Sequence, residues 1–337
     1  MMGAATNPKS TRRFRVDSWD LLLAVLTLGV LAYGAATTPN FLSAFNLSQL
    51  AAGVAEKALL VLPMVLLIIA REIDLSVASI LALSSVVLGL LVQAGLPLVA
   101  AIVLSLCFGA LLGAVNGVLV TWAGLPSLVV TLGTMALFRG VGYVLLGTAS
   151  VNIFPDALTN FGIDDVPGTR IPQVIMPFLI LFPLFAVVLG ATPFGRRVYA
   201  VGGSPAAALY SGIDITRVRF VLFVLSGAVS ALAGIVYTAR LANARANNAL
   251  GMELDVITIA LLGGVSVWGG KGRLTGVLLA LVLVALIRNI LGINQIGGDA
   301  QGMVVGLLLI GSLLVSNSTG FLVGWLRNIG ATQRSGG

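Results

Sequence analysis

Two Glu-apolar-Asp triplets are the clearest polar arrangement in this sequence, and each precedes an apolar stretch. Their carboxylates are Glu72, Asp74, Glu253 and Asp255. Capping is one role for them, because a helix N-terminus stabilises nearby carboxylates. The alternative is lining a polar path or pairing with an arginine, the candidates being Arg71, Arg240 and Arg245. The sequence has no histidine, and its single cysteine, Cys107, lies in an apolar run typical of a core residue, so we predict no catalytic site and no metal site.

The composition determines the environment of these groups. Apolar residues make up 58% of the 337 residues, charged residues make up 9%, and the mean hydropathy is +1.08. In soluble domains about a quarter of the residues are charged, and no soluble fold hides this much apolar surface. A soluble enzyme, a nucleic-acid binder and a disordered scaffold are therefore excluded. The sequence predicts an all-α, polytopic helical membrane protein.

Apolar stretches long enough to cross a bilayer recur along the chain. A transmembrane helix needs roughly 20 mostly apolar residues. About ten stretches qualify: 19–36, 53–70, 76–93, 97–121, 126–148, 171–191, 218–239, 253–268, 272–292 and 299–316. The eighth is short and rich in glycine, so we expect a broken or re-entrant segment there. Residues 1–36 also resemble a signal peptide, but the long apolar run between Trp19 and Tyr33 favours an uncleaved first span.

The positive charges predict how these spans are oriented. With the N-terminus inside, the outer side holds five basic residues: Lys57, Arg170, Arg240, Arg245 and Arg288. The cytoplasmic side holds thirteen: Lys9, Arg12, Arg13, Arg15, Arg71, Arg196, Arg197, Arg217, Arg219, Lys271, Arg273, Arg327 and Arg334. This bias favours both termini in the cytoplasm. We therefore expect a basic N-terminus (1–18), a single transmembrane domain (19–316) with a cytoplasmic loop at 192–217, and a cytoplasmic tail (317–337).

The sequence predicts that this chain does not bind ATP by a P-loop. Its longest polar intervals, 149–170 and 192–217, are too short for an ATPase domain. The phosphate-binding pattern Gly-x-x-x-x-Gly-Lys-Ser/Thr is absent, since the similar segment at 269–272 has Val265 and Gly272 at two required positions. If the chain pumps a solute, another subunit supplies the energy.

The cytoplasmic loop encodes a short helix with a signal at each end. Ser204 is a good N-cap, Pro205 suits the first helical position, and Gly212 stands where a left-handed C-terminal glycine belongs. A two-turn helix is too short to be stable alone in water. Its alanine face either docks into a groove of another protein or touches only this chain.

This segment is similar to the cytoplasmic coupling helix of bacterial ABC importer permeases. In that family a Glu-Ala-Ala-x-x-x-x-Gly pattern inserts into the ATPase subunit. Here residues 205–207 and 212–213 match, with Pro205 in place of the acidic residue, so no salt bridge is implied from that position. The resemblance assigns ATPase coupling to Ser204, Pro205, Ala206, Ala207, Leu209, Gly212, Ile213, Arg196 and Arg197.

Further stretches resemble the ribose/xylose/arabinose-type sugar permeases. Residues 73–77 look like the motif Gly-Gly-Ile-Asp-Leu-Ser-Val of that group, with Arg71 and Glu72 in place of its two glycines. Other motifs of the group are resembled, in order, at 125–134, 253–255, 262–266 and 269–273. The variant that begins at Arg71 looks most like the rhamnose-type permeases.

The resemblance implies the permease subunit of an ATP-driven monosaccharide importer in the bacterial cytoplasmic (inner) membrane. Its implied partners are an ABC ATPase that uses ATP and Mg, a periplasmic or extracellular sugar-binding protein, membrane lipid, and a second permease chain, either identical or a related paralogue. The chain itself would bind no cofactor and no nucleic acid. The alternative is an ion-coupled secondary transporter of a small polar solute, for which the sequence offers few deep titratable groups, mainly Arg139.

Polar side chains in or beside the spans are the candidates for a sugar path. They are Asp74, Ser76, Asn116, Ser127, Thr131, Thr134, Glu253 and Asp255. The three hydroxyls of span five lie near one face of its helix and either hydrogen-bond a sugar or bond back to their own helix. A glycine repeats every fourth residue in span four, at Gly109, Gly113 and Gly117, which predicts close packing against another helix.

Overall fold

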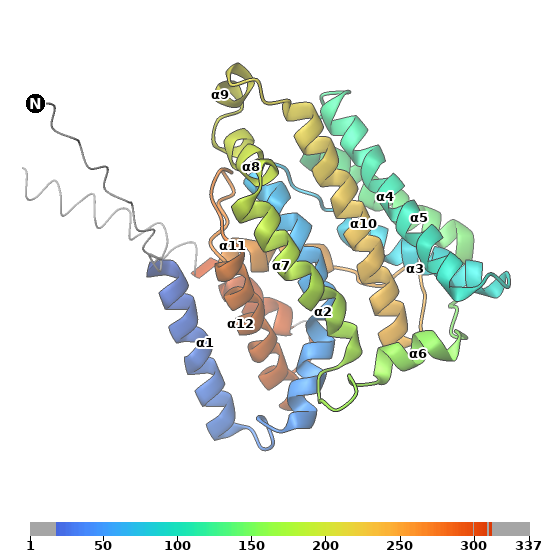
Figure 1. The fold of residues 1–337 in the computed structure, drawn as a ribbon. Coiled ribbons are helices and arrows are strands. Elements are labelled where there is room, and N and C mark those ends of the chain that lie inside the picture. Colours follow the sequence, from blue (N-terminus) through green and yellow to red (C-terminus); the bar gives the residue numbers. More distant parts are fainter. Residues whose placement is uncertain (1–17, 299, 309, 312–337) are drawn as a thin grey trace, which may run out of the picture.

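The computed structural model describes residues 18–311 apart from 299 and 309, and the regular elements in this part of the chain are all helices (Figure 1). The first six helices are α1 (Ser18–Thr37), α2 (Ala44–Ile69), α3 (Val77–Gln93), α4 (Leu98–Thr121), α5 (Ser127–Leu146) and α6 (Asp156–Ile163). A 3-10 helix, η1 (Gln173–Ile175), is followed by α7 (Met176–Ala191), α8 (Pro193–Gly203), α9 (Pro205–Tyr210), α10 (Ile215–Leu241), α11 (Met252–Leu262) and α12 (Leu274–Ile293). Residues 300–308 are helical as well.

Seven helices within the described residues are long and apolar enough to cross a membrane. They are α1, α2, α4, α5, α10, α12 and the segment Gln173–Ala191. The prediction of an all-α, multi-pass membrane protein is therefore confirmed. Several helix ends differ from the predicted ones. Helix α2 begins at Ala44 rather than at 53, because the Ser43 hydroxyl accepts a hydrogen bond from the Asn46 N–H (3.2 Å) and caps the helix earlier.

The predicted eighth span is short, as expected. Helix α11 has 11 residues and ends at Leu262, and residues 263–272 are not helical. Gly264, Gly269 and Gly270 in this segment have left-handed φ values of 83°, 77° and 71°, which only glycine adopts freely.

The predicted tenth span, 299–316, lies largely outside the described residues. Helix α8 was not anticipated, although Thr192 and Pro193 are ordinary helix-start residues.

Helices α2 and α10 form the centre of the bundle. In their membrane-spanning parts 78% and 61% of the residues are buried, against 28% for α4, α5 and the α7 segment. The glycine stripe of α4 packs on α10, as predicted, because a Cβ at Gly109 would overlap Ala231 and one at Gly113 would overlap the Phe223 carbonyl. Cys107, on another face of α4, is exposed, so its prediction as a core residue is wrong.

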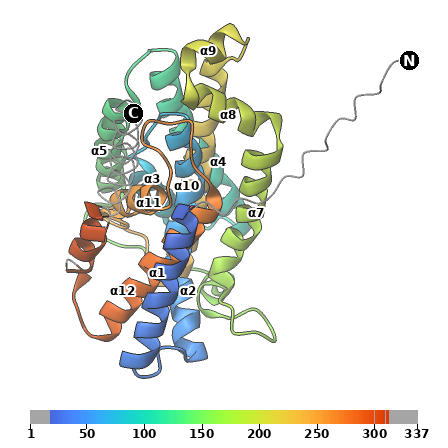
Figure 2. The ribbon, with the colours of Figure 1, turned by 90° about the vertical axis from the view of Figure 1, so that its left-hand side faces the viewer.

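The two ends of the bundle differ. Helices α8 and α9 project from one end, and α6 lies at the other (Figure 1). A view from the side shows α8 and α9 at the same end again, with α1, α2 and α12 packed together below them (Figure 2). The connections between α2 and α3, between α4 and α5, and between α9 and α10 all lie on the side of α9, so this end gathers most of the candidate residues.

Candidate coupling helix and polar site

Helix α9 has the boundaries that its sequence predicts. The Ser204 hydroxyl accepts a hydrogen bond from the Ala207 N–H (3.3 Å) and caps the N-terminus. At the other end, the Gly212 N–H donates to the Leu209 carbonyl (2.9 Å) and the Ile213 N–H to the Ala208 carbonyl (3.0 Å). This pair of bonds is a Schellman motif, which requires the left-handed φ of 75° found at Gly212. The helix is therefore held in a fixed shape despite its length.

One face of α9 is covered by this chain and the rest is open. Ala208 is 3% exposed, whereas Leu209 is 63% and Tyr210 is 92% exposed. Ala206 and Ala207 are exposed too, as are the predicted flanking arginines Arg196 and Arg197 on α8. Of the other predicted coupling residues, Pro205 and Ile213 are partly buried, and Ile213 packs against the core. The two capping residues, Ser204 and Gly212, are exposed.

Two residues of α9 differ from the sequence-based expectation. The family pattern leaves the position of Ala208 free, which predicts tolerance of substitution there, but Ala208 is the one buried residue of the helix. Tyr210 was not selected as a coupling residue, although a large aromatic side chain exposed on a short capped helix is typical of an interface anchor. The helical period alone could have separated these two positions, which lie on different faces.

Three predicted path residues meet in a buried polar cluster at the start of α3. Asp74 is fully buried and accepts three hydrogen bonds, from the Ser76 N–H (2.9 Å), the Ser76 hydroxyl (2.6 Å) and the Ser226 hydroxyl of α10 (2.8 Å). The Asn116 amide of α4 donates to the Ser76 hydroxyl (2.8 Å), while its carbonyl oxygen has no hydrogen-bond partner. The cluster thus joins α3, α4 and α10 at one carboxylate. Asp74 does not cap α3, whose N-cap residue is Ser76.

Two hydroxyl groups of α5 contact the connection between α2 and α3. The Ile73 N–H donates to the Ser127 hydroxyl (3.3 Å), and the Thr131 hydroxyl lies within hydrogen-bond distance of the carbonyls of Ile73 (3.2 Å) and Ser127 (2.8 Å). Thr134 bonds back to the Thr131 carbonyl (3.5 Å). The predicted bonding back to their own helix is found for Thr131 and Thr134. Ser127 and Thr131 also hold the α2–α3 connection, a role that was not predicted, and hydrogen bonding to a sugar stays a prediction.

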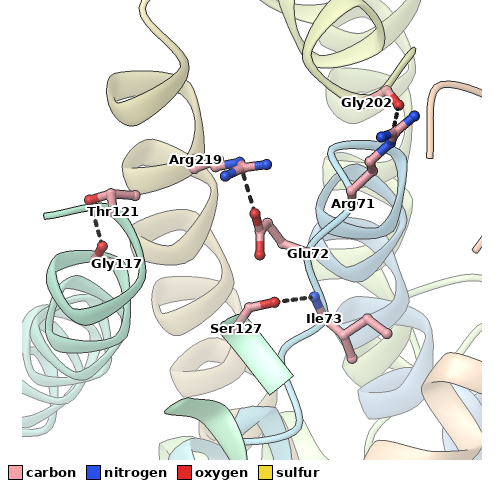
Figure 3. A network of polar contacts seen from close by, with 8 residues as sticks. All are labelled: Arg71, Glu72, Ile73, Gly117, Thr121, Ser127, Gly202 and Arg219. Carbon is pink, nitrogen blue, oxygen red and sulfur yellow. Dashed lines mark hydrogen bonds and ion pairs between the residues drawn. The ribbon is translucent and has the colours of Figure 1, made fainter. Parts of the chain in front are cut away.

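A cavity of 320 Å³ lies beside this connection, at the α9 end of the bundle. Its polar lining includes Ser127 and an ion pair in which the Arg219 Nε lies 2.8 Å from a Glu72 oxygen. Figure 3 shows Arg219 on α10 reaching toward Glu72, with Ser127 on the adjoining side. Burial raises the pKa of Glu72, and the Arg219 guanidinium opposes this shift. Sequence reasoning missed this pair, because Arg219 is distant in the chain.

Glu253 and Asp255 lie apart from this site. They occupy the first turn of α11, and Asp255 contacts Lys57 (2.8 Å) and Arg288 (2.5 Å). The predicted pairings with Arg240 or Arg245 are therefore wrong for Asp255, and Arg240 instead pairs with the buried Glu56 (2.7 Å).

The triplet that contains Asp74 is not helical, so the two Glu-apolar-Asp triplets have unlike local structures. Within the described part of the chain, no group of three acidic or cysteine side chains is suited to holding a metal ion.

Proteins of similar sequence identify the family of this chain. Residues 46–313 match the family described as "Branched-chain amino acid transport system / permease component". The chain belongs to this family. It is 36% identical over 290 residues to the D-allose transport system permease protein AlsC of Escherichia coli K12, covering 86% of this chain and 88% of AlsC. It is 31% identical over 324 residues to the ribose import permease protein RbsC of Haemophilus influenzae, covering 95% and 99%.

A third relative is the autoinducer 2 import system permease protein LsrD of Escherichia coli O9:H4, which is 33% identical over 299 residues, covering 87% of this chain and 90% of LsrD. No solved structure is significantly similar. The resemblance to ABC importer permeases is thus confirmed: the chain is a multi-pass permease subunit of the inner membrane and not an enzyme. ATP hydrolysis takes place on a partner ATPase, and a binding protein is the second partner of such importers.

Proposed function

We propose that this permease imports a monosaccharide and that α9 is the helix through which it engages its ATPase. The observation that carries the coupling assignment is the geometry of α9, which is capped at both ends, is anchored by Ala208, and presents Ala206, Ala207 and Tyr210 outward. Support for the substrate class comes from relatives named for allose and ribose transport. LsrD, named for autoinducer 2, makes that compound the main competing substrate.

The transport assay that tests this proposal uses proteoliposomes containing the permease, its ATPase and its binding protein. We expect accumulation of one sugar from a panel of D-ribose, D-allose and L-rhamnose, with uptake abolished by vanadate and unchanged by a proton uncoupler. Uptake that survives vanadate but collapses with the uncoupler would contradict ATP-driven import. Accumulation of autoinducer 2 and of none of the sugars would overturn the substrate class while leaving the coupling assignment intact.

The proposal includes ten spans with both termini in the cytoplasm and two permease chains in each transporter, identical or paralogous. The topology is supported by the charge bias of the sequence, because this orientation assigns thirteen basic residues to the cytoplasmic side and five to the outer side. Two permease chains would provide one α9 for each of two ATPase sites. In this topology the coupling loop at 192–217 lies on the ATPase side of the membrane. The proposal keeps the division into a basic N-terminus (1–18), a transmembrane domain (19–316) and a cytoplasmic tail (317–337).

Labelling with a membrane-impermeant thiol reagent tests this sidedness. Ala206 and Asn160 are exposed, on α9 and α6 at opposite ends of the bundle (Figure 1). After Cys107 is replaced by serine, we expect Ala206→Cys to be labelled only from the cytoplasm and Asn160→Cys only from outside. Ala206 is preferred to Ser204 because Ser204 caps α9. Labelling of Ala206→Cys from outside would invert the topology and remove α9 from the ATPase.

A further inference from the structure

We propose that Arg71 and Glu72 connect both ends of the coupling helix to the buried Asp74 cluster, so that a displacement of α9 moves the polar site inside the membrane. This inference rests on the proposed role of α9. The two residues, called here the Arg71–Glu72 bridge, occupy the connection between α2 and α3. They stand where the sugar-permease motif has two glycines, so the bridge is built from side chains that the motif lacks.

Arg71 holds the segment that leads into α9. Its Nε lies 2.6 Å from the Gly202 carbonyl and its Nη2 lies 3.0 Å from the Gly203 carbonyl. These are the last two residues of α8, and the next residue, Ser204, is the N-cap of α9. Carbonyls at a helix C-terminus lack partners within the helix, so a guanidinium is a favourable partner for them.

The backbone around this contact leaves little room for slippage. A Cβ at Gly202 would overlap the Ile69 carbonyl, and the same carbonyl accepts a hydrogen bond from the Gly270 N–H (2.8 Å). The end of α2, the end of α8 and the α11–α12 connection are therefore in direct backbone contact. When the start of α9 moves, Arg71 must move with it or break two hydrogen bonds.

Glu72 holds the segment that leads out of α9. Its partner Arg219 is the fifth residue of α10, and only residues 211–214 separate α9 from α10. The side chain of Glu72 is 6% exposed and that of Arg219 is 26% exposed, so water and salt screen this pair less than a surface pair. Figure 3 shows the two contacts side by side, with Arg71 reaching Gly202 and Glu72 facing Arg219.

The backbone at Arg71 supports a functional reading of this bridge. Arg71 has a φ of 65°, in the left-handed region that residues other than glycine adopt at an energetic cost. Glycine would relieve that cost, yet this chain carries arginine there and uses its side chain in two hydrogen bonds. Asp74 follows Glu72 after a single residue, and Ile73 between them is bonded to Ser127 and Thr131 of α5. The bridge therefore lies between the residues that flank α9 and the segment that leads through Asp74 into α3, and it contacts α10 directly.

Three single variants and one charge exchange test this proposal in the complete transporter. Arg71→Gly removes the guanidinium while suiting the left-handed backbone, and Glu72→Gln and Arg219→Gln each remove one charge of the ion pair. The double variant Glu72→Arg with Arg219→Glu restores opposite charges at the two positions. Arg217→Gln is the matched control, because Arg217 is exposed on the same helix two residues earlier. Membrane level, thermal stability and co-purification of the ATPase are measured for each.

The decisive quantity is the number of sugar molecules accumulated per ATP hydrolysed, with the sugar that the wild-type transporter accumulates in the panel above. We expect each single variant to bind the ATPase normally but to lower this ratio at least about fivefold, the lower end of typical coupling between sites. The control should match wild type, and the charge exchange should recover most of the ratio lost by Glu72→Gln.

Wild-type ratios in all three single variants would overturn the bridge while leaving the proposed function intact. A loss of stability or ATPase binding matching the loss of transport would reduce the bridge to a structural role. Failure of the wild-type transporter to show vanadate-sensitive uptake would instead contradict the proposed function.

Discussion

Replacing Ala207 by arginine should abolish sugar uptake while leaving the permease in the membrane at its normal level. Ala207 is exposed on α9 and makes its hydrogen bonds through its backbone only, the N–H to the Ser204 hydroxyl and the carbonyl from Ser211, so the fold does not depend on its small side chain. A groove of the ATPase shaped for alanine has no space for a guanidinium and would leave its charge without a partner. We expect ATPase association to weaken at least about thirtyfold, which corresponds to the 2 kcal/mol typical of an interface hot spot.

Two further substitutions make this expectation specific. Ala191→Arg introduces the same side chain at an exposed position on α7, at the same end of the bundle, and should leave uptake unchanged. Ala208→Arg should instead lower the amount of folded permease, since Ala208 is buried against this chain. Retention of wild-type uptake and ATPase association by Ala207→Arg would show that α9 is not the coupling helix. Co-purification of the ATPase from detergent, together with the uptake assay, measures both quantities.

Replacing Asp74 by alanine should destabilise the permease by about 3 kcal/mol or more. The carboxylate accepts three hydrogen bonds, and its loss leaves buried hydroxyl and N–H donors of Ser76 and Ser226 without their partner, at about 1–3 kcal/mol for each unsatisfied group. The effect should spread across α3, α4 and α10, because Asn116 depends on the same serine.

Asp74→Asn is the matched control. Its amide oxygen can accept both bonds from Ser76, and its amide nitrogen can donate to the Ser226 hydroxyl, which preserves the shape of the cluster. We expect this variant to retain most of the stability lost in Asp74→Ala, as measured by thermal unfolding of the purified protein in detergent. Equal unfolding temperatures for Asp74→Ala and wild type would mean that the cluster does not hold the three helices together.

The sequence predicts the local features of this protein better than its contacts. The boundaries of α9 follow from Ser204, Pro205 and Gly212, because capping depends on neighbouring residues only. The packing of α4 follows from the glycine stripe, since only small residues permit such a close approach. Neither kind of signal identifies a partner far away in the chain.

Ion pairs show this limit most clearly. Glu72 pairs with Arg219, and Asp255 pairs with Lys57 and Arg288, whereas the sequence offered only nearby or same-side arginines as candidates. Which charged side chains pair depends on how the helices are arranged in space. The hydrophobic periodicity of the sequence does not predict that arrangement. The burial of Ala208 has the same origin, because it depends on the neighbours that the folded chain places against α9.

The shortness of α11 also constrains how the protein is made. Eleven residues rise about 17 Å along a helix, well short of the roughly 30 Å hydrocarbon core of a bilayer. The first turn of α11 carries two carboxylates, and Asp255 obtains one of its cations, Arg288, from α12. On the ribosome α11 emerges before that cation exists, so it cannot be released into lipid as a finished span. We therefore expect its insertion to be completed together with α12 and against α2, the two helices that supply its cations.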